Sequence, residues 1–399
     1  MVCRTEIVNS VLYNYCPDVL PPVANRMQSL MQGRVIDELT GLGLTREVTV
    51  STDIEHVSTR ASFYGVCGLV ANPVHLFPGL NTNAVSLNMS VRANGYLPQT
   101  FVADLGPFNT AVGSPADYPE FFSPVNLGTI SMHRTATNIS GRCVKIDGIS
   151  HEPLDNAVVE VAGVWHQFPA ANVDPDDVME DPNIVSLVHG CYRRRFAGGD
   201  RVRQLDLVPL TGEEKVLLLS VAAGATQLRV SNRVNLAAGH LVAVDFQNTD
   251  LLEYIQVKAV DGATTAEQPA TITLEYPLKK EHREGITVLR VNPPSPPTAT
   301  ENILIRNAIA GDQTVYLDAL SDIDNSTVEI FGNGIPEYHR VSLYRVVSNS
   351  NGYFHLPSIS RVAMMKLCAS HDDMSNDIDV DYYSPDYDLF ENRIDFVFG

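Results

Sequence analysis

Short stretches of the chain alternate apolar and polar residues with the two-residue period of a half-buried β-strand. Leu87, Met89 and Val91 alternate with polar neighbours, and Asn94-Gly95 follows them as a typical hairpin turn. Long helical patterns are not evident, and 24 prolines with 26 glycines suit many short strands joined by turns. The pattern predicts an all-β protein.

Two segments of the chain repeat each other. Ala223-Gly224-Ala225-Thr226-Gln227 leads an alternating strand and is followed by Glu253-Tyr254-Ile255-Gln256-Val257. Ala310-Gly311-Asp312-Gln313-Thr314 leads another such strand, and Glu337-Tyr338-His339-Arg340-Val341 follows at nearly the same offset. Repeated small β units are typical of scaffold proteins, so the repeat predicts two related β modules.

A second repeat lies upstream and indicates two similar sandwiches in tandem. Gly33-Arg34-Val35-Ile36-Asp37 is matched by Gly141-Arg142-Cys143-Val144, each ahead of a turn and another strand. The proline-rich stretch 292–298 predicts a stiff linker. The predicted organisation is a short N-terminal arm over 1–32, β-sandwiches over 33–134 and 139–209, related β modules over 210–292 and 301–370, and an acidic tail with a terminal strand over 371–399.

Both ends of the chain carry apolar residues that suit binding to other proteins. Pro21 and Pro22 could open a short helix that ends at Gly33, or the same residues could lead directly into a strand. The last residues alternate in the manner of a strand, and added strands gain backbone hydrogen bonds. The predicted partner-binding residues are Val23, Met27, Leu30, Ile394, Phe396 and Phe398.

The charge balance disfavours nucleic acid and anionic membranes as partners. The chain has 28 basic and 47 acidic residues, for a formal net charge of −19. Binding to phosphates depends on clustered Lys and Arg, and the one basic cluster, around 193–203, lies in this acidic background. A solvated strand edge or an interface for an acidic partner is the favoured interpretation of that cluster.

Cysteine usage and hydropathy favour a cytoplasmic protein. The six cysteines are scattered without CxxC pairs, which indicates free thiols in a reducing compartment. No apolar run approaches the roughly 18 residues that a membrane span requires, and the N-terminus lacks the pattern of a secretory signal.

Sequence motifs for catalysis or cofactor binding are not evident, so the sequence predicts neither an enzyme nor a cofactor. Asp377, Asp379 and Asp381 alternate with apolar or aromatic residues, which places three carboxylates on one side of an extended segment. Carboxylate oxygens suit calcium, so these residues and the acidic loop 174–181 are the calcium candidates, but the segment lacks the glycine and the terminal glutamate of an EF-hand loop, and the sequence predicts no metal site. Alternatively, the charges protect an exposed strand edge from unwanted pairing.

Aromatic residues gather in the same tail. They could stack on a glycan, or they could dock the tail onto a neighbouring module, which is the favoured interpretation. The residues are Tyr382, Tyr383, Tyr387 and Phe390.

Two motifs resemble a known sandwich family. The segment Arg92-Ala93-Asn94-Gly95-Tyr96-Leu97-Pro98 resembles the end of carboxypeptidase-regulatory-like, transthyretin-type sandwiches. Gly141-Arg142-Cys143-Val144, leading to Pro153-Leu154-Asp155-Asn156-Ala157, resembles the same family. The resemblance implies the fold of the two sandwiches and says nothing of activity.

The chain as a whole resembles accessory proteins encoded with phage-tail-like extracellular contractile injection systems. The resemblance rests on the paired sandwiches together with the segments 168–175, 352–363 and 391–396. It implies a structural role, with a cap adaptor at the end distal from the baseplate as the first choice. The implied partners are tube, sheath or terminator proteins, in a symmetric homo-oligomer within a particle that lysis could release.

A carbohydrate-binding or adhesive protein is the alternative function, and an enzyme assembled from residues far apart in sequence ranks third. For the structural role, we expect deletion of 1–32 or of 371–399 to leave the modules folded and to abolish incorporation into particles.

Overall fold

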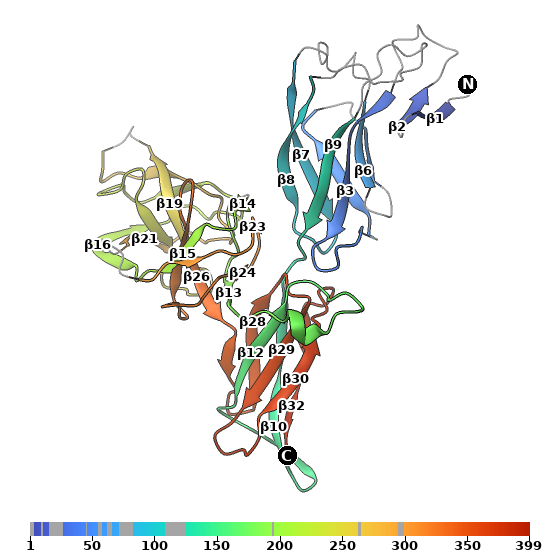
Figure 1. The fold of residues 1–399 in the computed structure, drawn as a ribbon. Helices are drawn as coiled ribbons and strands as arrows, with labels where there is room; N and C mark the ends of the chain where they lie inside the picture. Colours follow the sequence, from blue (N-terminus) through green and yellow to red (C-terminus); the bar gives the residue numbers. More distant parts are fainter. Residues whose placement is uncertain are drawn as a thin grey trace. The chain divides into compact units, whose positions relative to one another are not determined.

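The computed structural model describes residues 4–8, 11–15, 27–44, 46–54, 58–61, 66–71, 83–107, 124–193, 195–261, 265–293 and 299–399. Within these ranges the chain consists of β-strands, connecting segments and one short 3-10 helix, Pro175–Val178. This confirms the predicted all-β class. The chain forms two compact units, Met1–Thr135 and Ala136–Gly399 (Figure 1).

The first unit is a sandwich of two sheets. Its strands are Arg4–Val8 (β1), Val11–Tyr15 (β2), Met27–Asp37 (β3), Val48–Thr52 (β4), Ser58–Ala61 (β5), Val66–Ala71 (β6), Val85–Ala93 (β7), Gln99–Leu105 (β8) and Val125–Met132 (β9). One sheet has the order β1-β2-β3-β6-β5 with β9 also on β3, and the other has the order β4-β7-β8. The alternating residues Leu87, Met89 and Val91 are buried and share one core with Leu30 and Val35.

Part of the predicted N-terminal arm belongs to this sandwich. β1 and β2 form a hairpin, β2 pairs with β3, and β3 already begins at Met27. The helical alternative is therefore wrong from Met27 onward, because β3 pairs with β6 and β9 and its backbone groups are bonded in the sheet. The arm prediction over 1–32 is corrected in the same way.

The second unit contains another sandwich, built from two distant parts of the chain. Its strands are Thr137–Asp147 (β10), Ser150–Pro153 (β11), Val158–Trp165 (β12), Arg345–Val347 (β27), Tyr353–Ile359 (β28), Met364–Ser370 (β29), Ile378–Tyr383 (β30), Glu391–Arg393 (β31) and Phe396–Phe398 (β32). One sheet has β11, β28, β31 and β32 on β10, and the other has the order β27-β12-β29-β30.

This arrangement corrects the predicted boundaries 139–209 and 371–399. β12 pairs with β29 from Val158↔Ser370 to Trp165↔Met364, so the partner of an early strand comes some 200 residues later in the chain. The tail is not separate, because β30, β31 and β32 complete the two sheets. The reason is burial: the apolar faces of β10 and β12 are covered by residues from the C-terminal part of the chain.

Two β modules are inserted between β12 and β27. Their strands are Ile184–Leu187 (β13), Arg195–Phe196 (β14), Arg201–Gln204 (β15), Val208–Val216 (β16), Gln227–Val230 (β17), Leu241–Val244 (β18), Glu253–Val260 (β19), Ala270–Leu274 (β20), Thr287–Asn292 (β21), Asn302–Ile303 (β22), Ala308–Ile309 (β23), Thr314–Tyr316 (β24), Thr327–Phe331 (β25) and Glu337–Leu343 (β26). We name residues 208–292 module A, and residues 184–205 together with 302–343 module B. Module A is thus inserted into module B, which corrects the predicted module 301–370.

The two modules have the same strand pairing in a different chain order. β20 and β21 are the last strands of module A, whereas their counterparts β13 and β15 come first in module B. β20 pairs with β17 and β19, as β13 pairs with β24 and β26. β21 pairs with β16 and β18, as β15 pairs with β22 and β25. Module B is therefore a circular permutation of module A.

Individual hydrogen bonds support this equivalence. In module A, Gly224 N donates to Leu278 O at 2.7 Å and Leu278 N donates to Ala225 O at 2.9 Å. In module B, Gly311 N donates to Cys191 O at 2.8 Å and Cys191 N donates to Asp312 O at 3.0 Å. The modules meet where β19 and β26 pair antiparallel at Tyr254↔Tyr338, within the two repeated sequence segments.

Candidate functional site

The predicted partner-binding residues at the C-terminal end lie inside the second sandwich. Phe396 and Phe398 are 0% exposed, and their strand runs parallel to β10, with Cys143↔Phe396 and Lys145↔Phe398 as partners. Ile394 packs against the same core. The Ile394 carbonyl oxygen approaches Gly141 so closely that a Cβ there would collide with it. This explains why position 141 is a glycine.

The structure describes only some of the predicted partner-binding residues at the N-terminal end. Leu30 is fully buried in the first sandwich. Met27 begins β3, while its side chain and the whole of Val23 lie outside the described residues. The buried side chains at both ends are used by the protein's own cores, which leaves backbone edges as the surfaces that a partner could meet.

The deletion prediction is corrected for the same reason. Removal of 1–32 would take Leu30 and Met31 out of the first core, and removal of 371–399 would take three strands out of the second sandwich. Both deletions are now expected to unfold a sandwich instead of sparing it.

The acidic metal candidates lie at the edge strand β30 and face a lysine. Lys366 Nζ lies 3.2 Å from Asp379 Oδ2 and 3.1 Å from Asp381 Oδ1, while Asp377 directly precedes the strand. Hydrogen bonds to Asp381 and Asp379 raise the pKa of Lys366 above its usual value. Across the described ranges, no group of three His, Cys, Asp or Glu residues is placed to hold a metal ion. The acidic loop begins with Asp174, which caps the 3-10 helix by accepting from Asp176 N.

The tail aromatics differ in their surroundings. Tyr387 is buried, and its hydroxyl donates to Val362 O at 2.6 Å. Tyr382 lies with its ring centroid 5.5 Å from that of Trp165. Phe390, by contrast, is 86% exposed. Tyr387 and Tyr382 thus contact the sandwich to which the tail itself belongs, which corrects the interpretation that they dock the tail onto a neighbouring module.

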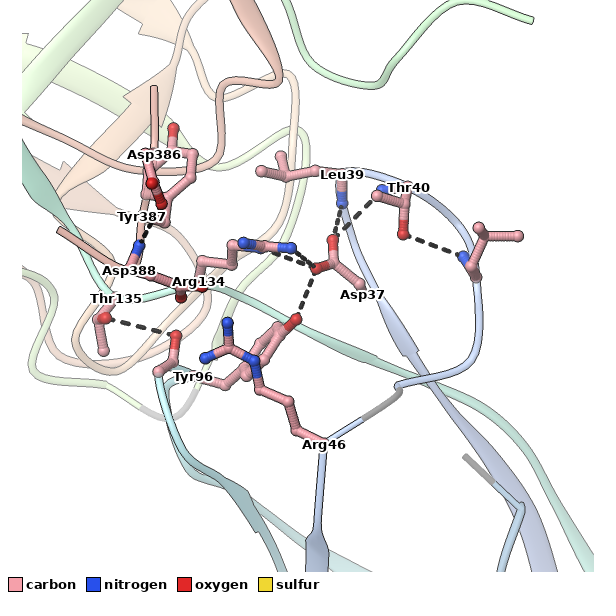
Figure 2. Close-up of polar contacts among 12 residues, drawn as sticks. Asp37, Leu39, Thr40, Arg46, Tyr96, Arg134, Thr135, Asp386, Tyr387 and Asp388 are labelled. Atoms are coloured by element: carbon pink, nitrogen blue, oxygen red, sulfur yellow. Dashed lines mark hydrogen bonds and ion pairs between the residues drawn. The ribbon is translucent and has the colours of Figure 1, made fainter. Parts of the chain in front are cut away.

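A buried carboxylate, Asp37 at the end of β3, accepts hydrogen bonds from three parts of the first sandwich (Figure 2). Asp37 Oδ2 accepts from the Tyr96 hydroxyl at 2.6 Å and from Arg134 Nε at 2.8 Å, and Asp37 Oδ1 accepts from Leu39 N at 2.8 Å. Burial, and then the hydrogen bond to Asp37, raise the pKa of Tyr96. The contacts join the upstream repeat, at Asp37, to the motif that resembles the sandwich family, at Tyr96.

A second buried polar centre lies where modules A and B meet. Glu253, the first residue of the repeat in module A, is 1% exposed. It accepts from the Tyr192 hydroxyl at 2.6 Å and interacts with His282 Nε2 at 3.0 Å. The backbone amides of Lys279 and Lys280 also donate to it.

These contacts set the protonation of the centre. Burial by itself would raise the pKa of Glu253, but the hydrogen bonds from His282, from Tyr192 and from the two amides outweigh it and lower the pKa below 4.5. Burial, and then the nearby Glu253 carboxylate, raise the pKa of Tyr192. Glu253 is therefore an ionised, well-bonded group that ties Tyr192 of module B to module A.

The equivalent glutamate of module B is bonded less completely. Glu337 is also 1% exposed, and its Oε2 accepts from Tyr192 N at 2.8 Å and lies 2.9 Å from His339 Nε2. Its Oε1 has no hydrogen-bond partner among the described residues. Glu253 and Glu337 are each the first residue of a strand that also contains apolar residues, in both repeated segments. This pattern in the sequence could have indicated the buried centre.

Two arginines of the basic cluster form ion pairs, one with Glu329 of module B and one with Glu301, which directly precedes the second segment of that module. Arg203 Nη2 lies 2.6 Å from Glu329 Oε2, and Arg201 Nη1 lies 2.7 Å from Glu301 Oε2. Each of the four described cysteines, Cys67, Cys143, Cys191 and Cys368, is a free thiol. No helix in the described ranges has the length and apolar character that a membrane crossing needs.

The chain matches no family model and no curated protein. Among solved structures, it is similar to the crystal structure of BcpA, the major pilin subunit of Bacillus cereus, with 10% identity, a TM-score of 0.20 and coverage of 92% of this chain and 98% of that one. A variant of the same subunit matches with 8% identity and a TM-score of 0.19, over 92% of this chain and 99% of that one. Scores at this level carry no argument about function.

Proposed function

We propose that this chain is a non-enzymatic structural connector of a phage-tail-like contractile injection system, a cap adaptor that joins the end of the tube and sheath to a terminator protein. The family resemblance of the sequence suggests the particle. The observation that supports a connector is that each sandwich has an early strand running parallel to its last strand, β3 with β9 and β10 with β32.

In the first sandwich, β3 pairs in parallel with β9, from Met31↔Val125 to Asp37↔Met132. Because the two strands are parallel, β3 begins at one end of the pair and β9 finishes at the other end. Tension between these two points is directed along the strands, so the hydrogen bonds between them are loaded together. Such a shear arrangement resists force better than one in which bonds open one after another.

The second sandwich has the same arrangement. β31 and β32 run parallel to β10, from Asn138↔Glu391 to Lys145↔Phe398. The chain leaves this sandwich after β12, forms modules A and B, and returns to it at β27. β12 and β27 are direct neighbours, paired at Glu160↔Arg345. The inserted modules therefore lie outside the path of tension through the sandwich and are free to make lateral contacts.

Isolation of the tagged full-length chain from its source, followed by mass spectrometry, tests the particle assignment. We expect tube and sheath subunits, or a terminator, to co-purify with an oligomer of the chain. A solitary monomer that turns over a small molecule would overturn the proposal. Specific binding to a glycan array without particle proteins would support the carbohydrate-binding alternative instead.

Force spectroscopy on the full chain tests the connector role by itself. Handles at residues 27 and 133, or at 137 and 399, load the parallel strand pairs. Handles at 208 and 292 load β16 and β21, which pair antiparallel at Val208↔Asn292 and open bond by bond. We expect both sandwiches to unfold at a several-fold higher force than module A, and equal forces would contradict the role.

A further inference from the structure

Module A contains a cleft of about 510 Å³ that the proposed connector role does not use. The cleft is lined by Asp245, Asn248, Leu251, Glu281, Arg283 and Ile286. Asp245 is the most buried of the six, with 7% of its surface exposed, while Asn248, Glu281 and Arg283 are exposed and the two aliphatic residues are half-buried.

The Asp245 carboxylate lacks a hydrogen-bond donor within the described part of the chain. The nearby His282 does not supply one, because its Nδ1 lies 3.6 Å from Asp245 Oδ2, beyond hydrogen-bond distance. His282 is 0% exposed, its Nε2 is engaged by Glu253 Oε1 at 3.0 Å, and its Nδ1 has no hydrogen-bond partner. The Asp245 carboxylate lines the cleft and has no donor among the described residues, so a charged donor that enters the cleft would find an acceptor that no side chain or amide of theirs already occupies.

We propose that this cleft binds a primary ammonium group on an aliphatic stem, as carried by a lysine side chain of a partner protein. An ammonium group has three donors and a positive charge, which suit the carboxylates of Asp245 and Glu281. The methylene stem would lie against Leu251 and Ile286. Arg283 is the opposing charge of the lining, and its guanidinium donors suit a backbone carbonyl of the peptide that carries the lysine.

The charge of the whole protein favours a partner lysine over a free amine as the source. A formal net charge of −19 attracts basic protein surfaces and increases the rate of their encounter. A lysine presented on such a surface also has less freedom to lose on binding than a free alkylamine. The inference does not depend on the particle assignment.

Module B provides an internal contrast. Val244 pairs with Val288 in module A as Ile330 pairs with Val202 in module B, so the next residue, Asp245, is equivalent to Phe331. The Phe331 ring faces the guanidinium of Arg203, with 4.4 Å between the ring centroid and Cζ. The carboxylate is thus a feature of module A, and the permuted copy has an aromatic side chain in its place.

The test is a titration of the full-length chain with a capped peptide that contains one lysine, followed by calorimetry or ligand-observed NMR. The same peptide with norleucine in place of lysine keeps the stem and removes the charge, and 1,5-diaminopentane represents a free amine. The variants are Asp245→Asn and, as the matched control, Asp250→Asn, an exposed carboxylate of the same loop that does not line the cleft.

We expect saturable binding of the lysine peptide, an affinity at least tenfold lower for Asp245→Asn, and no change for Asp250→Asn. Circular dichroism melts of both variants verify that they fold, and Glu281→Gln, with its exposed side chain, supplies a second variant with a smaller expected loss.

Equal binding of the norleucine peptide, or full binding by Asp245→Asn, would overturn the proposal. Tighter binding of the diamine than of the peptide would support the ammonium site but reject a partner lysine, and stoichiometric binding of zinc alone would overturn it in favour of a metal site.

Discussion

Module A and module B share their strand pairing and differ in how the chain passes through it. Module A is one continuous segment, 208–292, whereas module B needs 184–205 as well as 302–343. The matching bonds at Gly224 and Gly311 show that the same contacts form from either order of strands. The comparison teaches that the pairing pattern, not the chain order, defines this module.

The modules also differ in how they satisfy the glutamate that they have in common. Glu253 is bonded by two side chains and by two backbone amides, and one of the side chains, Tyr192, comes from the other module. Glu337 has one amide and His339, and one of its oxygens is left without a partner. Module A therefore relies on module B for part of its polar core, in addition to the strand contact at Tyr254↔Tyr338.

The largest effect is expected from separating the modules. The fragment 206–293 contains every strand of module A and should fold by itself, with a cooperative thermal transition in circular dichroism. The fragment 300–344 lacks β13 and β15, so β25 and β26 lose partners and the core loses Val185 and Val202. We expect it to be unfolded, and a cooperative transition for this fragment would refute the permuted arrangement.

A smaller effect is expected from removing each glutamate in the full chain. Glu253→Ala leaves His282, the Tyr192 hydroxyl and two amides buried without their acceptor, and we expect a loss of about 3–5 kcal/mol in the free energy of unfolding. Glu337→Ala removes fewer bonds and an oxygen that was already unpaired, and we expect a loss of about 1–3 kcal/mol. Urea unfolding measures both. Equal losses would show that the richer bonding of Glu253 has no energetic consequence.

The smallest effect is expected in the pH dependence of the free energy of unfolding. The pKa of Glu253 is lower in the folded chain than the ordinary value of 4.5. Its contribution to stability is therefore complete above pH 4.5 and is lost as the pH falls through the lowered pKa of the folded state. Glu253→Gln should flatten this acid dependence in urea unfolding below the ordinary glutamate pKa of 4.5, whereas Glu284→Gln, at an exposed carboxylate, should keep the slope of the unmodified chain. An unchanged slope for Glu253→Gln would contradict this assignment.

Much of the fold could be predicted from local patterns. The alternation at Leu87, Met89 and Val91 indicated a half-buried strand, and β7 has these residues in the core. The repeated Glu-Tyr segments predicted two related modules, and β19 and β26 contain them. The circular permutation could not be predicted, because the counterparts of β20 and β21 come before the repeat and have no recognisable sequence likeness to them.

The candidate sites were harder to predict. The sequence pattern predicts Phe396 and Phe398 as partner-binding residues, and the structure buries both, because a terminal apolar strand has the same pattern whether a partner or its own sandwich covers it. The sequence gives no indication of Asp245, since a single aspartate after an apolar strand carries no local signal. Its importance depends on His282, a residue far along the chain that comes close only in the folded module.

The sequence by itself determined that the chain forms short strands and turns and that two of its segments are alike, because alternation and turn chemistry act between residues close in the chain. The tertiary structure decided which strands pair: β10 with β31 and β32, β12 with β29, and module A within module B. Many pairings satisfy the backbone of a strand equally well. The choice among them depends on which apolar faces bury one another, and that is a property of the whole folded chain.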